Sequence, residues 1–547
     1  MTGTALTWSV ALVLGALTFA FRYLSFSDFA NDHFVHLSTA QQLLLGALPV
    51  RDFVERGMPL MTAMSAAAQI VLGQGLWAEL MLIAAAFAVS AAVVFVVAAA
   101  ASRSRVAALA AAVATVVASP IGYAYPKHLV YAIAFGVAWW YGREPRRVRL
   151  VALAVAVAAA FYVRHDHGLL LAAGSVAFLV ALHRRSAARP VAFFAGVVLL
   201  CVAPFLIWVQ AYEGVGNYVH DGIEFSKREA DRTRGWWPPP PFALGRGEPM
   251  PLLENAVALL YWFLWATPPG CLAVLLASRA VRHSSVAPLV LMAAVVQLGL
   301  NVTMLRDPVA QRIRDALVPA VLVAAIGAAA LWRAGHRGSL RGAARVAVVA
   351  VLAMFVIASA SAGSFGERVD RANVRNGVAG MRARARQIGI ELAPPRHRTG
   401  RDDSGYVALA EYVAACTTPD ARVFAMTFAP ELFFYANRGF AGGHVTLTPG
   451  YYVSDRHAAL MLSRLSRENV PLVIVDAGTH DDYVRDYPRV TRFVAERYRE
   501  AWHVADPRGD IVVWADATRR PTGTWGAGKR LPCFATVAPV PAPVPVG

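Results

Sequence analysis

Charged side chains are scarce in this chain, and their scarcity excludes most classes of protein. Asp, Glu, Lys and Arg make up only 16% of the 547 residues, whereas 57% are hydrophobic. Soluble and disordered chains carry more charge and less apolar surface. The composition therefore predicts an integral membrane protein, long enough for a multi-span bundle and one further domain.

Lysine is nearly absent, occurring only at Lys127, Lys227 and Lys529. The net charge of +17 is thus carried by arginines, many of them in short segments between apolar stretches. Cytoplasmic loops of membrane proteins show this pattern, whereas nucleic-acid-binding proteins have a basic stripe interleaved with aromatic residues. We expect a membrane partner and no nucleic acid.

Cysteine is also rare, and the common zinc and nucleotide motifs are missing. Cys201 and Cys271 lie in apolar stretches, while Cys416 and Cys533 could pair in an oxidising compartment, which the sequence leaves open. There is no CxxC spacing, no GxxxxGK(S/T) loop and no GxGxxG turn. Zinc and nucleotide binding therefore have no support in the sequence.

Long apolar runs are abundant. Taking about 17 to 25 apolar residues per crossing, we expect about eleven spans, at residues 6–24, 77–101, 106–121, 128–142, 150–163, 168–182, 190–211, 252–278, 285–304, 314–332 and 346–363. The loops assigned to the cytoplasm hold 15 Lys or Arg in 36 residues, and the opposite loops hold 13 in 99. This bias predicts an inner or plasma membrane protein with its C-terminal part outside, and it makes residues 59–73 a surface helix rather than a crossing.

The stretch of residues 28–60, in the first outer loop, carries Asp28, Asp32, Asp52 and Glu55. Apolar side chains recur in it at helical spacing: Phe34, Leu37, Leu44, Leu45 and Leu48. This pattern predicts a helix lying in the plane of the membrane surface. Asp32 stands where a helix N-cap would, so it either caps the helix or is available for chemistry.

The same stretch resembles the first outer loop of the GT-C membrane glycosyltransferases. Asp32 is followed by Phe34 and by a helix that ends in Gly46-Ala47-Leu48-Pro49-Val50-Arg51-Asp52-Phe53. The branch that it looks most like includes protein O-mannosyltransferases and the aminoarabinose transferase of lipid A. The resemblance implies a GT-C bundle in which Asp32 is the catalytic base. The family usually has an acidic residue where this sequence has His33, which argues against a two-carboxylate or metal-assisted variant; a divalent cation, Mg or Mn, is left open.

The predicted topology places the remaining polar clusters on the outer side as well. Asp28 and Asp166 are second choices for the base or for positioning the acceptor. Arginine and lysine at span ends can bind phosphate, although they can also meet lipid headgroups, and Arg164 and Asp166 can form an ion pair. The loop of residues 212–250, with Trp236 and Trp237, is either functional or disordered. The candidates for substrate binding are His33, Lys127, His128, Arg164, Arg306, Arg312 and Arg314.

The chain divides at the end of the last predicted span. Residues 1–363 form the predicted membrane domain, and residues 364–400 are Arg-rich and read as a linker or surface helix. Residues 401–520 alternate helical patterns with short apolar strands, at 406–415, 422–426, 458–465, 471–476, 489–499 and 511–514, which predicts a small outer α/β domain. Residues 521–547, rich in Pro toward the end, are predicted to be a disordered tail.

Taken together, the sequence predicts a mainly α, polytopic membrane protein of GT-C type with a small C-terminal α/β domain. We expect it to transfer a sugar from a polyprenyl-phosphate donor to an extracytoplasmic glycan, lipid or protein acceptor with inversion. Asp32 would accept the proton of the acceptor hydroxyl, and the cations would stabilise the departing phosphate. Two alternatives stay open: a transporter or flippase for a lipid-linked saccharide, and a non-catalytic subunit for envelope assembly.

Overall fold

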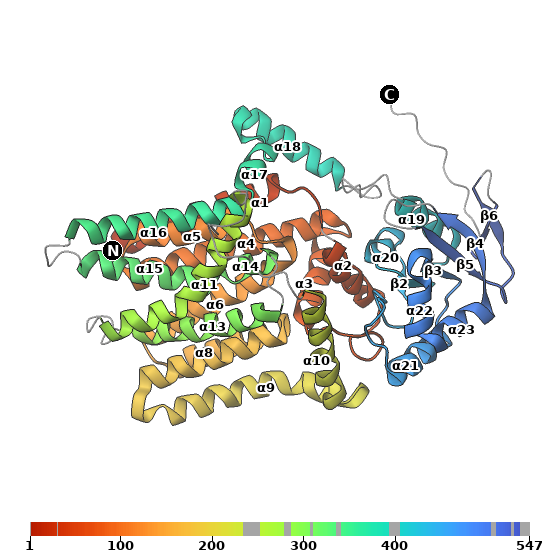
Figure 1. Ribbon diagram of the computed structural model, residues 1–547, viewed down its shortest axis with the longest axis horizontal. Helices are drawn as coiled ribbons and strands as arrows, with labels where there is room; N and C mark the ends of the chain where they lie inside the picture. The colour runs from red at the N-terminus through yellow and green to blue at the C-terminus, as the bar shows by residue number, and fades with distance from the viewer. Residues whose placement is uncertain are drawn as a thin grey trace, which may run out of the picture.

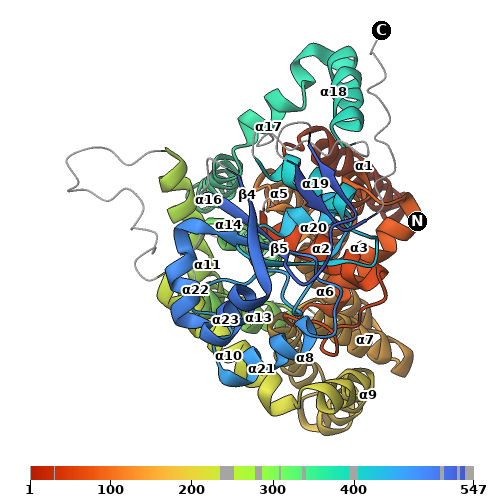
Figure 2. The ribbon, with the colours of Figure 1, turned by 90° about the vertical axis from the view of Figure 1, so that its right-hand side faces the viewer.

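A bundle of long helices carries a smaller α/β domain at one end. The computed structural model describes residues 2–29, 31–233, 252–277, 286–306, 310–334, 341–392, 405–504, 510–526 and 530–535. Figure 1 shows the bundle helices running along the long axis of the molecule, with the C-terminal domain, in blue, at the right. Viewed from that side, the C-terminal domain lies in front of the bundle (Figure 2).

Each of the eleven apolar segments predicted from the sequence is a helix. These helices are α1 (Thr2–Leu24), α4 (Leu76–Ser102), α5 (Arg105–Val117), α6 (Tyr125–Arg143), α7 (Arg147–Val163), α8 (His165–His183), α9 (Ala188–Tyr212), α11 (Leu252–Ala277), α13 (Ala287–Arg306), α15 (Leu317–Ala334) and α16 (Arg341–Ala362). The bundle core is rich in Ala and Val, and the large side chains of Phe95, Tyr131 and Phe135 are fully buried in it. Small residues let helix backbones approach closely.

The number of spans is lower than predicted. Among the described residues, six helices are long and apolar enough to cross a membrane, or seven if α16 and α17 (Phe365–Arg371), bent by 57°, form one span. Part of the difference arises because α5, with 13 residues, α7, with 17, and α15 are too short for the criterion of about 20 residues per crossing. Helix α3 (Pro59–Leu72) has 14 residues, too few for a crossing, as the loop charges suggested.

Short helices fill the space between the bundle and the C-terminal domain. They are α2 (Asn31–Leu44), α3, the 3-10 turn η1 (Gly122–Ala124), α10 (Val215–Arg232) and α14 (Ala310–Asp315). Figure 1 shows α2, α3 and α10 between the two parts. Helix α10 lies within the loop of residues 212–250, so that part of the loop is ordered; Trp236 and Trp237 lie outside the described residues.

Helix α2 differs from the surface helix predicted for it, because its polar face is covered as well. The Ser38 hydroxyl donates to the carbonyl of Pro430 at 2.6 Å. The Gln41 amide donates to the carbonyls of Phe433 and Arg438, at 3.1 and 3.2 Å. The C-terminal domain thus occupies the side that the sequence pattern assigned to water.

The C-terminal domain is a mixed sheet with helices on its faces. Strands β1 (Arg422–Met426), β2 (Gly439–Phe440), β3 (Leu472–Asp476), β4 (Tyr498–Val504) and β5 (Ile511–Asp516) lie in the order β2-β1-β3-β5-β4. Strands β1, β2 and β3 are parallel, and β5 is antiparallel to its neighbours. The surrounding helices are α19 (Gly405–Cys416), α20 (Pro430–Ala436), α21 (Asp455–Leu465), α22 (His480–Asp486) and α23 (Pro488–Arg497).

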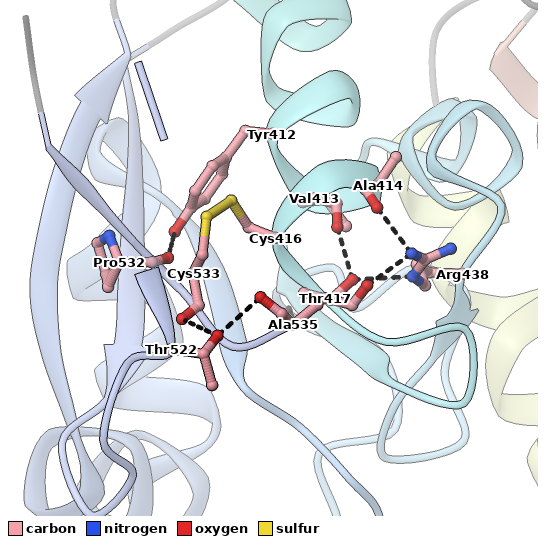
Figure 3. The surroundings of a disulfide bond; sticks show 10 residues. All are labelled: Tyr412, Val413, Ala414, Cys416, Thr417, Arg438, Thr522, Pro532, Cys533 and Ala535. Carbon is pink, nitrogen blue, oxygen red and sulfur yellow. Dashed lines mark hydrogen bonds between the residues drawn. A yellow bond between two sulfur atoms is a disulfide. The ribbon is translucent and has the colours of Figure 1, made fainter. Parts of the chain in front are cut away.

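Helices occupy part of the segment predicted to be a linker or surface helix, and strands extend into the segment predicted to be a tail. The segment assigned to the linker contains α17 and α18 (Gly377–Glu391), and the Arg384 guanidinium on α18 donates to the carbonyl of Phe26 at 2.5 Å. The segment assigned to the tail contains the hairpin of β6 (Gly523–Trp525) and β7 (Leu531–Cys533). A disulfide ties Cys533 to Cys416 on α19, which explains the extension (Figure 3). Residues 536–547 lie outside the described residues.

Candidate functional site

Asp32, the predicted base, is at the start of α2 on the side of the bundle that faces the C-terminal domain. Its side chain is exposed, and within the described residues it forms no hydrogen bond or ion pair. The N-cap interpretation is therefore not what the structure shows. Nearby protein atoms remove part of its hydration and raise the pKa of the carboxyl, and the positive charge of Arg56 acts in the opposite direction.

Three arginines from separate parts of the chain act electrostatically on Asp32. They are Arg56 in the first outer loop, Arg232 at the end of α10 and Arg312 on α14, and the acidic Glu229 on α10 opposes them. Glu229 is itself held by Arg232 at 2.7 Å and by the Tyr451 hydroxyl at 2.6 Å. Asp32 thus lies in a field with more positive than negative charge.

The pKa of His36, one turn further along α2, is affected by the same positive charges. Burial and the neighbouring His33 hold the pKa of His36 well below its usual value, and the charges of Arg56, Lys127 and Arg164 lower it further. A positive field around an otherwise uncommitted carboxylate suits a substrate that carries phosphate.

Arg56 was not among the predicted site residues. Its guanidinium donates to the hydroxyl of Thr446 in the C-terminal domain at 2.6 Å, and the Val54 amide donates to the carbonyl of Gly443 at 2.9 Å. The loop that carries Arg56 is therefore anchored to a domain about 390 residues away along the chain. The only signal in the sequence is weak: Arg56 is a basic residue directly after Glu55 in a stretch that also contains Arg51.

Glu55 has a structural task beside Arg56. Its carboxylate accepts the backbone N–H groups of Gly57 at 2.7 Å and Met58 at 2.6 Å, just before α3 begins at Pro59. It also accepts from the Tyr218 hydroxyl of α10 at 2.5 Å, and the Tyr218 oxygen lies 2.8 Å from Nε2 of His165. Glu55 therefore fixes the turn that presents Arg56.

His33 lies beside the base but is buried, and its partner is a carboxylate inside the bundle. Nε2 of His33 is 2.9 Å from Oε1 of Glu79 on α4, and the Ser65 hydroxyl donates to the same oxygen at 3.1 Å. Both side chains are at most 1% exposed. The predicted role of His33 in binding substrate is thus replaced by a structural contact, and the apolar span of α4 carries one buried acid that the sequence analysis passed over.

Lys127 and His128 are turned toward protein groups. The Lys127 ammonium forms an ion pair with Asp315 of α14 at 2.7 Å, with both side chains at most 10% exposed. His128 is 1% exposed and packs against the Phe87 ring. Neither lies free in the field around Asp32, although the Lys127–Asp315 pair helps to fix α14, which carries Arg312.

The turn between α7 and α8 forms the ion pair that the sequence analysis considered. Nε of Arg164 donates to Oδ1 of Asp166 at 2.9 Å, and the same oxygen accepts the backbone N–H of His167 at 2.9 Å. Asp166 is therefore committed to the start of α8 and is a poor base. Asp28, the other second choice, accepts the N–H of Phe29 at 2.6 Å.

The three arginines predicted near residues 306–315 have different surroundings. Arg312 acts on Asp32, as described above. The Arg314 guanidinium instead donates to the carbonyls of Ser119 and Ala362, at 3.2 and 3.4 Å, and ties α14 to the ends of α5 and α16. The side chain of Arg306 lies outside the described residues.

One group of possible metal ligands occurs among the described residues, and it is not centred on Asp32. It consists of Glu213, Asp221 and His457, at the contact between α10 and α21. Arg456 already forms ion pairs with Glu213, at 3.4 Å, and with Asp221. A guanidinium therefore neutralises these carboxylates, and the structure offers no further support for the Mg or Mn ion left open by the sequence.

Comparison with solved structures finds the same fold in ArnT from Cupriavidus metallidurans bound to undecaprenyl phosphate. The match covers 94% of this chain and 98% of ArnT, with a TM-score of 0.51 and 17% sequence identity. The apo state of ArnT matches over the same shares, with a TM-score of 0.48 and 16% identity. No family model and no curated protein matches the sequence. The GT-C type of fold, predicted from the first outer loop, is thereby confirmed.

Proposed function

We propose that this protein is a membrane glycosyltransferase that transfers a sugar from a polyprenyl-phosphate donor to an extracytoplasmic acceptor. The observation that carries the proposal is an exposed Asp32 that has no hydrogen-bond or ion-pair partner among the described residues and is acted on by Arg56, Arg232 and Arg312. The fold that it shares with ArnT, a protein whose crystal structure contains undecaprenyl phosphate, supports the class of donor.

Asp32 would act as the general base. The acceptor hydroxyl attacks the anomeric carbon, its proton passes to the carboxylate, and the bond to the phosphate oxygen breaks, which inverts the configuration. A pKa above the usual carboxyl value strengthens Asp32 as a base. It has no competing hydrogen bond among the described residues to give up.

Arg56 and Arg312 would stabilise the departing polyprenyl phosphate. Guanidinium groups bind phosphate through paired N–H donors, and their charge offsets the negative charge that develops as the bond breaks. Arg164 adds to the same field through its effect on His36. Because cationic side chains supply this charge, we expect transfer to continue when divalent ions are chelated.

The test is transfer by Asp32→Asn in membranes supplied with a polyprenyl-phosphate sugar. We expect a loss of about 10²-fold or more, the size of a general-base contribution.

In the parent protein, the rate should fall with acid at a pH above the usual Asp value of about 3.9, because the pKa of Asp32 is raised. Asp481→Asn, an exposed acid on α22, is the matched control. Transfer by Asp32→Asn at the parental rate would refute the base, and movement of labelled lipid-linked sugar without a glycosidic product would favour a transporter.

A further inference from the structure

A polar cavity, whose lining residues do not include Asp32, lies between the membrane domain and the C-terminal domain. It has a volume of about 70 Å³, and its walls come from the first outer loop, the end of α9 and the region of α21. The side chains that decide its chemistry are Arg51, Tyr212, His444, His457, Arg464 and Arg467. A space of this size holds several water molecules, and hence a group as large as a phosphate.

The cavity is lined by more cations than anions. Arg51 pairs with Asp52 at 2.7 Å, but Arg464 and Arg467 form no ion pair within the described residues. Arg464 donates to the carbonyls of Val50 and Arg51, at 3.4 and 3.1 Å, which orients its guanidinium at the cavity wall. The acid in the wall, Glu213, is already paired with Arg456, and Glu468 nearby is paired with Arg422 at 3.7 Å.

His444 gives independent support for a ligand site in the cavity wall. Its side chain is only 4% exposed, yet Nδ1 is buried and has no hydrogen-bond partner among the described residues. Buried polar atoms in folded proteins nearly always have a partner. Burial keeps the pKa of His444 well below its usual value, so the neutral ring can offer either a donor or an acceptor.

The backbone beside His444 is shaped to let a guanidinium approach. Gly443 has φ of 79°, and a Cβ at this position would lie 2.1 Å from an Nη atom of Arg464. Only glycine fits this backbone conformation and leaves room for Arg464. The close approach places Arg464 next to His444, at the same wall of the cavity.

We infer that this cavity binds a phosphate group, held by Arg464 and Arg467 with His444 as a neutral hydrogen-bond partner. Two guanidinium groups can bind the oxygens of a phosphate, whereas they would repel a cation. The carboxylates nearby are already paired with Arg456. The phosphate could belong to a soluble acceptor saccharide or to a lipid headgroup. Its role in catalysis rests on the proposed function: Val54 lines the cavity and is two residues from Arg56, so the cavity adjoins the loop that serves Asp32.

The experiment is a binding titration on the full-length protein in nanodiscs of neutral lipid, with inorganic phosphate as the probe. We expect the dissociation constant to rise by about tenfold or more in Arg464→Gln/Arg467→Gln, because a hydrogen bond to a charged group is lost at each position. Arg467→Gln alone, at an exposed position, should weaken binding without the risk to folding that Arg464 carries. Arg485→Gln, an exposed arginine on α22, is the control and should bind phosphate as the parent does.

The titration is repeated in Arg56→Gln/Arg312→Gln, which removes the two cations proposed to bind the donor phosphate. Unchanged phosphate binding in the arginine variants, or none in the parent, would overturn the cavity proposal whether or not the protein transfers sugar. A second arm replaces phosphate with phosphatidic acid in the nanodisc. Competition between lipid and phosphate would assign the cavity to a headgroup, whereas binding of phosphate alone would assign it to a soluble or glycan acceptor.

Discussion

At the scale of single residues, the structure separates side chains that are committed to protein from those that are available to substrate. Lys127, Arg314 and Asp166 are bonded to Asp315, to backbone carbonyls and to Arg164, respectively. The roles of Asp32 and Arg312 stay predictions, and Arg56 joins them as a further candidate. Charge at the end of a span is thus a poor guide by itself, because most such groups meet a partner of their own.

Arg56→Gln tests the cation that was not predicted. We expect kcat/KM for the donor to fall by about tenfold or more, because a charge-assisted hydrogen bond to phosphate is lost. Steady-state kinetics at varied donor concentration measure the effect. Arg228→Gln, an exposed arginine on α10, should leave the kinetics unchanged. A parental value in Arg56→Gln would remove Arg56 from the donor site.

Substitution of Glu79 tests whether transfer depends on the buried contact between Glu79 and His33. Glu79→Ala leaves His33 without its 2.9 Å partner and should lower stability by about 1–3 kcal/mol. Glu79→Gln keeps an acceptor oxygen and should cost less. Thermal unfolding of the purified variants compares the two, and the larger loss of stability should accompany the larger loss of transfer, because His33 directly follows Asp32 on α2. An equal effect of both variants would show that the contact does not matter.

The sequence could predict the Arg164–Asp166 pair because its motif is local, and it could single out Asp32 as a candidate for the same reason. It could not assign Lys127, because its partner Asp315 lies 188 residues further along the chain. The same holds for His33 and Glu79, which are 46 residues apart and meet only when α2 packs on α4. Pairs of this kind follow from packing, which no spacing rule encodes.

At the scale of elements, α10 connects the membrane domain to the C-terminal domain through a polar cluster. Nε2 of His457 lies 2.9 Å from Asp221, and Arg456 bridges Asp221 and Glu213. Burial alone would raise the pKa of Asp221, but the hydrogen bonds from His457 and Arg456 outweigh it and lower the pKa to about 2. This contact therefore depends on an ionised Asp221.

The pH dependence of this contact follows from the lowered pKa. An unfolded Asp titrates near about 3.9, so the stabilisation by Asp221 is complete above that pH and is lost as the pH falls toward about 2. We expect faster hydrogen exchange in α10 and α21 only in this acid range. Asp221→Asn should exchange faster already at pH 7 and respond less to acid. A parental exchange rate in that variant at pH 7 would contradict the role of the cluster.

Helix positions were predictable, whereas their environments were not. The apolar runs identify all eleven bundle helices, since long stretches of Ala, Val and Leu favour helix in any apolar setting. The span count was too high because segments such as α5 are apolar yet short. The polar face of α2 looked solvated because the groups that cover it, the carbonyls of residues 430–440, come from the far end of the sequence.

At the scale of the whole molecule, the disulfide closes the C-terminal domain over 117 residues. It joins α19 to β7, and Figure 3 shows the Tyr412 hydroxyl beside it, bonded to the carbonyl of Pro532 at 2.8 Å. Disulfides persist in oxidising compartments, which supports the outer location proposed for this domain.

Cys416→Ser/Cys533→Ser should lower the stability of the C-terminal domain by about 2–5 kcal/mol, as expected for loss of a native disulfide. Unfolding monitored in that domain measures the effect. In the parent protein, alkylation of intact cells before lysis should find both cysteines blocked. Free thiols at Cys416 and Cys533 would place the domain on the cytoplasmic side.

Helix α2 packs between two parts of the protein: α3 and α4 of the membrane domain on one side and α20 of the C-terminal domain on the other. The position of Asp32, the proposed base, therefore depends on both parts of the protein at once. A protein truncated after residue 392 would keep every side chain proposed to bind the donor. It would lose the contacts between the C-terminal domain and α2, the helix that carries the proposed base. Any change that shifts the C-terminal domain would therefore also shift Asp32, even if it occurs far from that side chain.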